Sequence, residues 1–327
     1  MPPASATLIR LPNPLGDAVM ATPMLRALRT ALPKEQLVVA GNPAFESLLE
    51  GLDSFDAFLP LPRGRGMGRV LREARALKSA EARRILLLTN SWSSALAARL
   101  ASIPERVGRG NRGRGFLLNT ALPPAREPRP MTEIYMELVP DLDIPPGPVE
   151  LARPPNTEPG SFLGVAPGAA FGPSKIYPVA LLAAAVRRAV ESTGLSPRIL
   201  GAPEESALLA ELADRLEETG IVLDSGSGPC SDLADARLKI AECRVLLCMD
   251  SGARHIAAAL GVPQVALYGP THPAWTAHGT EGLTSLRRTL AEVPCLACHK
   301  ARCPIDHPCM EKISPGEVAE AILETLT

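Results

Sequence analysis

The chain has 327 residues, of which 46% are hydrophobic and 3% aromatic, and its formal net charge is −1. This length is enough for two domains that each bury a full core. A near-neutral charge argues against a general nucleic-acid binder, and the scarcity of aromatic residues argues against stacking on single strands. No apolar run approaches the ~20 residues that span a bilayer. The first residues, MPPASATLIR, lack the basic start and apolar core of a signal peptide. We therefore expect a cytoplasmic protein with no nucleic-acid partner.

Charge is distributed unevenly along the chain. Residues 1–150 have a net charge of +4 and residues 151–327 a net charge of −5. Residues 63–114 hold 13 basic and three acidic side chains, a net charge of +10. We expect this segment to face an anionic substrate or a membrane surface, and the alternative is an ordinary solvated basic face.

The first half begins with a strand and a glycine-containing turn. Residues 6–11 are predicted as a buried strand, and residues 18–32 as an amphipathic helix in which Pro23 disturbs the first turns. Further strands are predicted at 36–40 and 85–89, and basic flexible loops at 62–69 and 108–115.

The turn after the first strand carries Gly16 and Asp17. Gly16 permits a tight turn. Asp17 is either the N-cap of the following helix or a carboxylate at the carboxyl end of the sheet, able to take a proton from a hydroxyl nucleophile. The Gly-x-Gly-x-x-Gly fingerprint of dinucleotide-binding proteins is absent from this turn.

Residues 140–160 are rich in proline, which excludes a helix or a central strand, and we interpret them as an interdomain linker. Strands and helices alternate on both sides of this linker, which predicts two doubly wound parallel sheets. In the second half, the expected strands are 162–166, 198–200, 245–249 and 264–268, and the expected helices are 178–192 and 253–260.

Ligands of doubly wound sheets bind beyond the carboxyl ends of the strands. Asp250, Ser251 and Gly252 lie at such an end, where the N-terminus of a helix favours an anion. His255 follows on the first turn. The alternatives are a capping aspartate and a histidine packed in the core.

Two further loops end strands of the second half. The loop 167–175 is rich in small residues, so a ligand can approach its backbone, and its lysine can neutralise a diphosphate or be an ordinary surface residue. Carboxylates in the other loop can accept hydrogen bonds from ribose or simply begin a solvated helix. The candidate residues of the two loops are Gly168, Ala169, Ala170, Ser174, Lys175, Glu204 and Glu205.

Four of the seven cysteines form a cluster, Cys295, Cys298, Cys303 and Cys309. The spacing is compatible with a structural zinc site, but it departs from the regular zinc-ribbon pattern. Reduced thiols and local disulfides are the alternatives.

Several motifs resemble one family, the ADP-heptose:lipopolysaccharide heptosyltransferases of glycosyltransferase family 9, and in particular their type II branch. The similarity lies in Arg10 to Pro23 (RLPNPLGDAVMATP), Pro167 to Lys175 (PGAAFGPSK), Asp250 to His255 (DSGARH) and Gly269-Pro270-Thr271. The cysteine-rich tail also looks like that branch. Pro14, Tyr177 and Arg254 depart from the branch's usual residues.

The resemblance implies a GT-B architecture, in which two doubly wound Rossmann-like domains face each other across a cleft. Residues 1–155 would bind the acceptor and residues 156–327 the nucleotide sugar, with the last helix returning to the first domain. The implied activity is inverting transfer of heptose from ADP-L-glycero-D-manno-heptose to the inner core of lipopolysaccharide, without a metal or any other cofactor. The acceptor would be of the lipid A–Kdo–heptose type, reached by peripheral contact with the inner face of the inner membrane.

The resemblance also assigns roles to residues. Asp17 would be the general base, and Lys175 would stabilise charge on the leaving diphosphate. Gly16 and the candidate residues of the second half would bind the donor, with Glu204 or Glu205 at its nucleoside end. We expect basic side chains of the segment 63–114 to hold acceptor carboxylates and phosphates, namely Arg63, Arg65, Arg109 and Arg112. Two rival functions are a nucleotide-sugar 2-epimerase of similar architecture and a non-catalytic nucleotide-sugar-binding protein.

Overall fold

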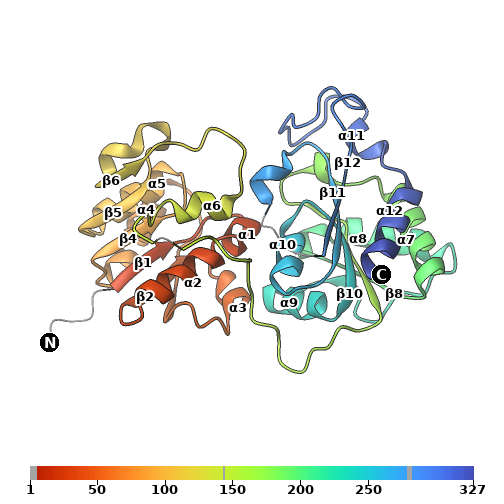
Figure 1. The fold of residues 1–327 in the computed structure, drawn as a ribbon, viewed down its shortest axis with the longest axis horizontal. Coiled ribbons are helices and arrows are strands. Elements are labelled where there is room, and N and C mark those ends of the chain that lie inside the picture. The colour runs from red at the N-terminus through yellow and green to blue at the C-terminus, as the bar shows by residue number, and fades with distance from the viewer. Residues whose placement is uncertain (1–5, 143, 278–281) are drawn as a thin grey trace. The chain divides into compact units, whose positions relative to one another are not determined.

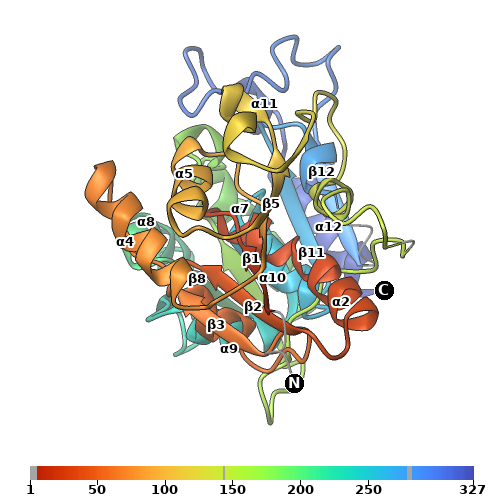
Figure 2. The same cartoon turned by 90° about the vertical axis from the view of Figure 1, so that its left-hand side faces the viewer.

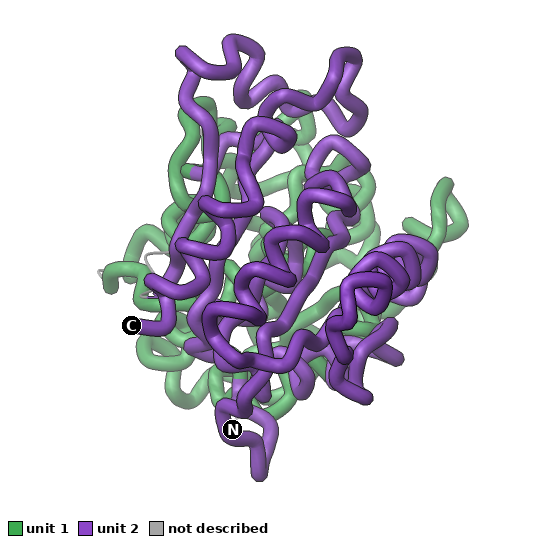
Figure 3. Tube along the Cα trace, turned by 90° about the vertical axis from the view of Figure 1, so that its right-hand side faces the viewer, with its two compact units in different colours: residues 1–151, 274–278 green, residues 152–273, 279–327 purple. Residues whose placement is uncertain are grey.

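The computed structural model describes residues 6–142, 144–277 and 282–327, and the chain forms two compact units (Figures 1 and 3). Unit 1 comprises residues 1–151 and 274–278, and unit 2 comprises residues 152–273 and 279–327. The division falls inside the proline-rich stretch, where residues 144–161 form neither helix nor strand. Each unit is built around its own parallel sheet.

Within the described residues, the sheet of unit 1 has six parallel strands in the order β3-β2-β1-β4-β5-β6. The central strand β1 (Ala6–Arg10) is buried along its whole length, as expected of a strand covered on both faces. Helices α4 and α5 cover one face through a shared apolar cluster. The other strands are β2 (Gln36–Gly41), β3 (Ala57–Pro60), β4 (Arg84–Leu87), β5 (Glu105–Arg109) and β6 (Thr120–Leu122). The helices are α1 (Leu15–Val19), α2 (Thr22–Ala31), α3 (Phe45–Leu49), α4 (Gly66–Lys78), α5 (Trp92–Leu100), the 3₁₀-helix η1 (Asn111–Leu117) and α6 (Met131–Met136).

The single helix expected at 18–32 is two helices, α1 and α2. Proline lacks the N–H that an interior helical position needs, but it is tolerated in a first turn. Pro23 accordingly lies in the first turn of α2, and Ala21 is the N-cap. The break separates the short helix that carries Asp17 from the longer helix behind it.

The sheet of unit 2 has six parallel strands within the described residues, in the order β12-β11-β10-β7-β8-β9. The expected strands at 162–166 and 264–268 are found with those bounds, as β7 and β11. The remaining strands are β8 (Ser196–Gly201), β9 (Gly228–Pro229), β10 (Cys243–Met249) and β12 (Leu283–Arg287). The helices are η2 (Pro173–Lys175), α7 (Val179–Thr193), η3 (Pro203–Glu205), α8 (Ser206–Glu217), α9 (Leu233–Ala241), α10 (Gly252–Ala259), α11 (Pro308–Glu311) and α12 (Pro315–Leu326). The 3₁₀-helix η4 (Pro273–Thr276) begins at the last residue before the chain passes back into unit 1.

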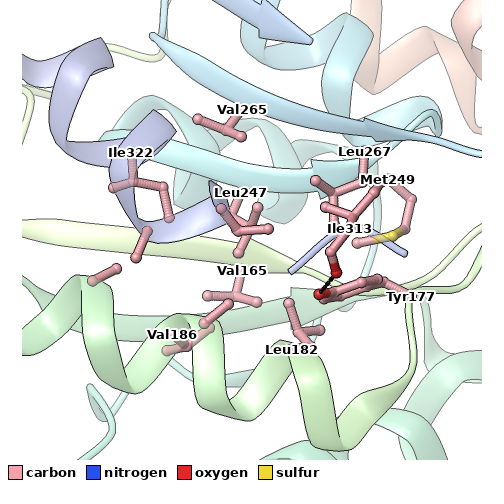
Figure 4. Close-up of a cluster of buried hydrophobic side chains, with 14 of the residues drawn as sticks. Val165, Tyr177, Leu182, Val186, Leu247, Met249, Val265, Leu267, Ile313 and Ile322 are labelled. Atoms are coloured by element: carbon pink, nitrogen blue, oxygen red, sulfur yellow. Dashed lines mark hydrogen bonds between the residues drawn. The ribbon is translucent and has the colours of Figure 1, made fainter. Parts of the chain in front are cut away.

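The core of unit 2 joins the sheet to α7 and α12 (Figure 4). The last helix, α12, packs on α7 and on strands β10, β11 and β12, all within unit 2. Ile322 and Val318, on its inner face, are fully buried among the side chains of the sheet, which fixes the helix on unit 2. The expectation that the last helix also returns to the first domain stays a prediction.

Across the residues that the structure describes, no helix has the length and apolar character needed to cross a bilayer.

Candidate active site

Asp17 lies in the first turn of α1, directly beyond the carboxyl end of β1. Pro14 occupies the N-cap position, so Asp17 is not the cap of this helix. Its side chain is half-buried. Burial raises the pKa of the Tyr135 hydroxyl well above its usual value, and the negative charge of Asp17 raises it further, which places the carboxylate near that ring. Asp17 therefore sits where a ligand at the carboxyl edge of the sheet can meet it.

The loop between β1 and α1 is held by Arg10, the last residue of β1. Its guanidinium donates to the carbonyl of Leu11 and, at 3.3 Å, to Oδ1 of Asn13. Arg10 is only 5% exposed, and burial lowers its pKa, although a nearby carboxylate opposes that shift. The guanidinium thus fixes the backbone just before Asp17.

The carboxylate that balances Arg10 belongs to Glu73 of α4. Arg10 Nε donates to Glu73 Oε1 at 3.0 Å, and Arg69 donates to the other oxygen. Glu73 is completely buried. A carboxylate is stable at such a position only when it is paired. Sequence analysis did not identify this pair, because 63 residues separate its two members.

The four arginines predicted to bind the acceptor have different surroundings. Arg63 and Arg65 are exposed near the start of α4, and Arg112 is exposed in the loop after β5. Arg109 is 5% exposed, and its guanidinium donates to the carbonyls of Pro123 and Ile134 and to Glu137. Its donors therefore hold the chain after β5 together, and a contact between Arg109 and the acceptor stays a prediction.

In unit 2, the predicted donor residues Lys175 and Asp250 are in direct contact. Lys175 Nζ donates to Asp250 Oδ2 at 2.6 Å and to the Asp250 carbonyl at 2.9 Å. The hydroxyl of Thr271 donates to the same Oδ2 at 2.7 Å. Both charged side chains are buried. Burial alone would raise the pKa of Asp250, but the charges of Lys175 and Arg254 and these hydrogen bonds outweigh burial and lower it. Asp250 is therefore ionised at neutral pH.

Arg254 adds a second cation to the same carboxylate. Its Nε lies 3.5 Å from Asp250 Oδ1, and its side chain is fully buried. A terminal nitrogen of Arg254 lies 3.2 Å from Nε2 of His255. Because a guanidinium only donates, His255 Nε2 accepts and carries no proton there. Two buried cations thus surround one buried carboxylate, a formal surplus of one positive charge.

The surplus charge lies beside the N-terminus of α10. Ser251 is the N-cap, and its side chain makes no capping hydrogen bond. The first N–H groups of a helix have no partners within the helix and carry partial positive charge. Ser251 and Gly252 are half-buried. Backbone donors and two cations at one strand end form a site suited to a diphosphate.

The loop 167–175, which follows β7 and carries several of the predicted donor residues, is called the donor loop. It is packed closely against Glu205. A Cβ built on Gly168 would lie 1.9 Å from Glu205 Oε1, so a larger residue there would displace the Glu205 carboxylate. Glu205 Oε2 accepts from the N–H of Ala202 at 2.9 Å, and this bond closes its own turn. Glu204 is exposed. The structure therefore brings Gly168 and Glu205 together and leaves the Glu204 carboxylate facing solvent.

The other end of this loop is held by the segment 295–309. The hydroxyl of Ser174 donates to the carbonyl of Lys300 at 2.6 Å, and His307 Nε2 donates to the carbonyl of Ser174 at 2.5 Å. Gly172 has a φ of 143°, and a Cβ there would lie 2.6 Å from the Ala301 carbonyl oxygen. Ala169 is half-buried and Ala170 is exposed between these two contacts.

The segment 295–309 does not form the zinc site suggested by its spacing. Within the described residues, no three His, Cys, Asp or Glu side chains are arranged to hold a metal ion. Cys295, Cys298, Cys303 and Cys309 are free thiols. Burial raises the pKa of Cys309 to about 11, with a further rise from the three neighbouring thiols. The backbone and His307 of this segment support the donor loop instead.

Below Lys175, Tyr177 anchors the chain to the C-terminal region. Its hydroxyl donates to the carbonyl of Ile313 at 2.6 Å, and Figure 4 shows this bond at the margin of the core. The ring is fully buried, and burial raises the pKa of Tyr177 to about 12.

Comparison with known proteins identifies the family. The sequence model of glycosyltransferase family 9 (heptosyltransferase) matches residues 70–307, well over half of the chain. The chain belongs to glycosyltransferase family 9. The match decides for a transferase, so the epimerase and the non-catalytic binding protein are set aside.

Individual relatives of this glycosyltransferase agree with the family match. It is 27% identical to lipopolysaccharide heptosyltransferase 2 of Salmonella typhimurium over 81% of this chain and 83% of that protein. It is 28% identical to lipooligosaccharide heptosyltransferase 2 of Haemophilus ducreyi over 82% and 84%. The structure of E. coli ADP-heptose LPS heptosyltransferase II matches with a TM-score of 0.80 at 24% identity, over 98% of each chain. The last comparison shows a shared fold, that of two Rossmann-like GT-B domains.

Arg254 belongs to the same cluster as Lys175 and Asp250, although in the sequence it stands out only as a departure from the family pattern. The signal was the spacing Asp250 to Arg254, which places both side chains on one face of a helix start. Nothing in the sequence indicated that both would be buried.

Proposed function

We propose that the chain transfers heptose from ADP-L-glycero-D-manno-heptose to the inner core of lipopolysaccharide, with inversion at the anomeric carbon. The reported relatives are named as lipopolysaccharide and lipooligosaccharide heptosyltransferases. A solved E. coli heptosyltransferase, WaaC, holds an ADP-2-deoxy-2-fluoro heptose. The observation that carries the proposal is the buried cluster of Lys175, Asp250 and Arg254, because its surplus positive charge suits a nucleotide diphosphate.

The donor diphosphate binds at the N-terminus of α10. Backbone N–H groups of Ser251 and Gly252 donate to phosphate oxygens, and the ammonium of Lys175 neutralises part of their charge. His255, in the first turn of α10, helps to bind the diphosphate end of the donor. The small residues of the loop 168–170 let the nucleotide approach the backbone, and Glu204 or Glu205 accepts from the ribose hydroxyls.

The reaction is a single displacement. A hydroxyl oxygen of the acceptor attacks the anomeric carbon of the heptose, and its proton passes to the Asp17 carboxylate. The bond between the anomeric carbon and the β-phosphate oxygen breaks, and its electron pair leaves on ADP. The negative charge that grows on the diphosphate meets donors that are already in place, which lowers the barrier.

The proposed chemistry uses no metal ion. A glycosyltransferase must stabilise the leaving diphosphate, and here Lys175, Arg254 and the N-terminus of α10 supply the positive charge. We expect turnover to be unchanged after treatment with EDTA, measured with the same donor and acceptor.

The acceptor binds at the carboxyl edge of unit 1. Arg63, Arg65 and Arg112 present exposed guanidinium groups there, and guanidinium pairs well with the carboxylates and phosphates of a lipid A–Kdo–heptose acceptor. Because such an acceptor carries acyl chains, the enzyme works in peripheral contact with the inner face of the inner membrane.

The decisive experiment changes Asp17 to Asn. This variant keeps the size of the side chain and removes the base, so we expect kcat to fall by about 10²- to 10⁴-fold. Turnover is measured as ADP release and as heptosylated acceptor, with ADP-heptose and a panel of truncated core acceptors. Asp53→Asn, at an exposed position of unit 1, is the matched control and should behave as the wild type.

Near-normal kcat of Asp17→Asn, with unfolding temperature unchanged, would refute the base assignment. Incubation with donor alone tests the rival enzyme class, since an epimerase converts a nucleotide sugar without any acceptor.

A further inference from the structure

The outer face of α4 combines apolar and basic side chains. Met67 is 58% exposed and Leu71 is 43% exposed, four residues apart on one side of the helix. Arg72, Arg75 and Lys78 are exposed on the following turns. The adjoining side of the helix, with Val70, Ala74 and Leu77, packs into the apolar cluster of unit 1. Figure 2 shows α4 at the margin of the unit.

A pair of exposed aromatic rings lies close to the start of the neighbouring helix. Trp92 is the first residue of α5, and Phe116 lies in η1. Their ring centroids are 5.1 Å apart in an edge-to-face arrangement. Trp92 is 43% exposed and Phe116 is 72% exposed, although large aromatic rings are usually well covered. The Trp92 indole N–H donates to the carbonyl of Arg112 at 2.9 Å, which holds the pair in place.

These apolar side chains belong to one edge of the unit. Helices α4 and α5 each follow a strand of a parallel sheet, so both begin at its carboxyl edge, and they pack against each other. Met67 lies in the first turn of α4 and Trp92 in the first turn of α5. Asp17 follows β1 at the same edge. The exposed apolar residues therefore accompany the end of the sheet that carries the proposed base.

The cations of α4 are available to an external partner. Within the described residues, Arg72, Arg75 and Lys78 take part in no ion pair, whereas Arg69 is paired with buried Glu73. The surrounding segment 63–114 carries the net charge of +10. Apolar residues next to unpaired cations on an exposed helix face are typical of attachment to an anionic lipid surface.

We propose that the outer face of α4 and the Trp92–Phe116 pair dock unit 1 on an anionic phospholipid bilayer. Met67, Leu71 and the two rings enter the headgroup region, and Arg72, Arg75 and Lys78 meet lipid phosphates. The inference extends the proposed function, in which the acceptor is a membrane lipid, but the binding itself requires no catalysis.

The test is sedimentation of the full chain with vesicles. One set contains phosphatidylcholine alone and the other about three parts phosphatidylcholine to one part phosphatidylglycerol, without lipopolysaccharide. We expect binding to the anionic vesicles only, weakening as salt rises. Each cation near an anionic surface contributes about fivefold to the affinity, so Arg72→Gln/Arg75→Gln/Lys78→Gln should bind roughly 100-fold more weakly. Met67→Ser/Phe116→Ser removes apolar area that would enter the headgroup region, so its affinity for the anionic vesicles should fall on the order of tenfold.

Two control proteins match these changes. Arg187→Gln/Arg188→Gln/Arg215→Gln removes the same charge from unit 2, and Val222→Ser removes an 83% exposed apolar side chain there. Both should bind like the wild type. All variants should turn over a water-soluble truncated acceptor at the wild-type rate and unfold at the wild-type temperature. If Met67→Ser/Phe116→Ser unfolds at a lower temperature than the wild type, Phe116→Ser alone replaces it.

The proposal is overturned if the wild type ignores anionic vesicles, if neutral vesicles bind equally well, or if the unit 2 controls lose as much binding as the α4 variants. Asp17→Asn separates it from the proposed function, because that variant should lose transfer and keep vesicle binding.

Discussion

Glu73 in unit 1 and Asp250 in unit 2 are both buried carboxylates, and each is shared by two cations. Glu73 accepts from Arg10 and Arg69, and Asp250 from Lys175 with Arg254 nearby. Both pairs involve the carboxyl end of a central strand, β1 in one unit and β10 in the other. The partners of the cations differ. The remaining donors of Arg10 are taken by the backbone of Leu11 and by Asn13, whereas the cluster around Asp250 lies against the N-terminus of α10.

The difference shows that one electrostatic arrangement can serve two purposes. In unit 1 the buried charge fixes the shape of a loop, and the loop presents Asp17. In unit 2 it holds two buried cations next to the N-terminus of α10, where the proposed function places the donor diphosphate. The comparison predicts that removing each carboxylate should affect different measurable quantities.

The largest effect is expected for Asp250→Asn. Without the negative charge, the buried Lys175 and Arg254 lose the carboxylate that they share, so the free energy of unfolding should fall by about 3–5 kcal/mol. Urea unfolding followed by circular dichroism measures the change. Thr271→Val removes only one hydrogen bond to the same carboxylate and should cost about 1 kcal/mol. Similar losses for the two variants would contradict the view that charge compensation dominates.

Glu73→Gln is expected to lose less stability, about 1–3 kcal/mol, because Arg69 can turn toward solvent. The substitution should also affect turnover, because Arg10 is held less firmly and the loop before Asp17 shifts. We expect kcat to fall roughly tenfold, while the KM for the donor stays within a factor of about two. Arg69→Gln keeps the Arg10–Glu73 bond and should retain kcat. A rise in donor KM instead of a fall in kcat would contradict the assigned role.

The smallest effect concerns the free energy of unfolding in acid. The pKa of Asp250 is lowered below the ordinary value of 3.8 by Lys175 and Arg254, which outweigh burial. Its stabilisation is therefore complete above pH ~4 and disappears as the pH falls through the lower, folded value. Urea midpoints of wild type and Asp250→Asn, measured from pH 7 down to pH 3, should converge in acid. A difference between the two urea midpoints that grows as the pH falls would contradict a lowered pKa of Asp250.

Much of the fold could be predicted from local pattern. The buried strands β7 and β11 are uninterrupted apolar runs between glycine or proline turns, and their bounds were found as expected. The placement of Lys175 and Asp250 at the ends of strands was also predictable, because ligand sites of parallel sheets lie there, and their role in donor binding stays a prediction. Strands β6 and β9, of three and two residues, are too short for their pattern to be read.

The pairings between distant residues were not predictable. Arg109 has the same local sequence as its exposed neighbours, and only the folded chain shows that its guanidinium is enclosed by carbonyls. The cysteine spacing left zinc, reduced thiols and local disulfides open. In the structure the four cysteines are free thiols, and the segment is placed by His307 and by backbone contacts with a loop 133 residues away.

The donor loop is confined from both ends before any nucleotide arrives. The Glu205 carboxylate lies against Gly168, and at Gly172 a Cβ would lie 2.6 Å from the backbone carbonyl oxygen of Ala301. Backbone freedom that these contacts remove on folding is not lost again on binding. In the proposed function, the nucleotide sugar therefore meets a loop whose backbone is already held, and the loop need not be ordered again after each release of ADP.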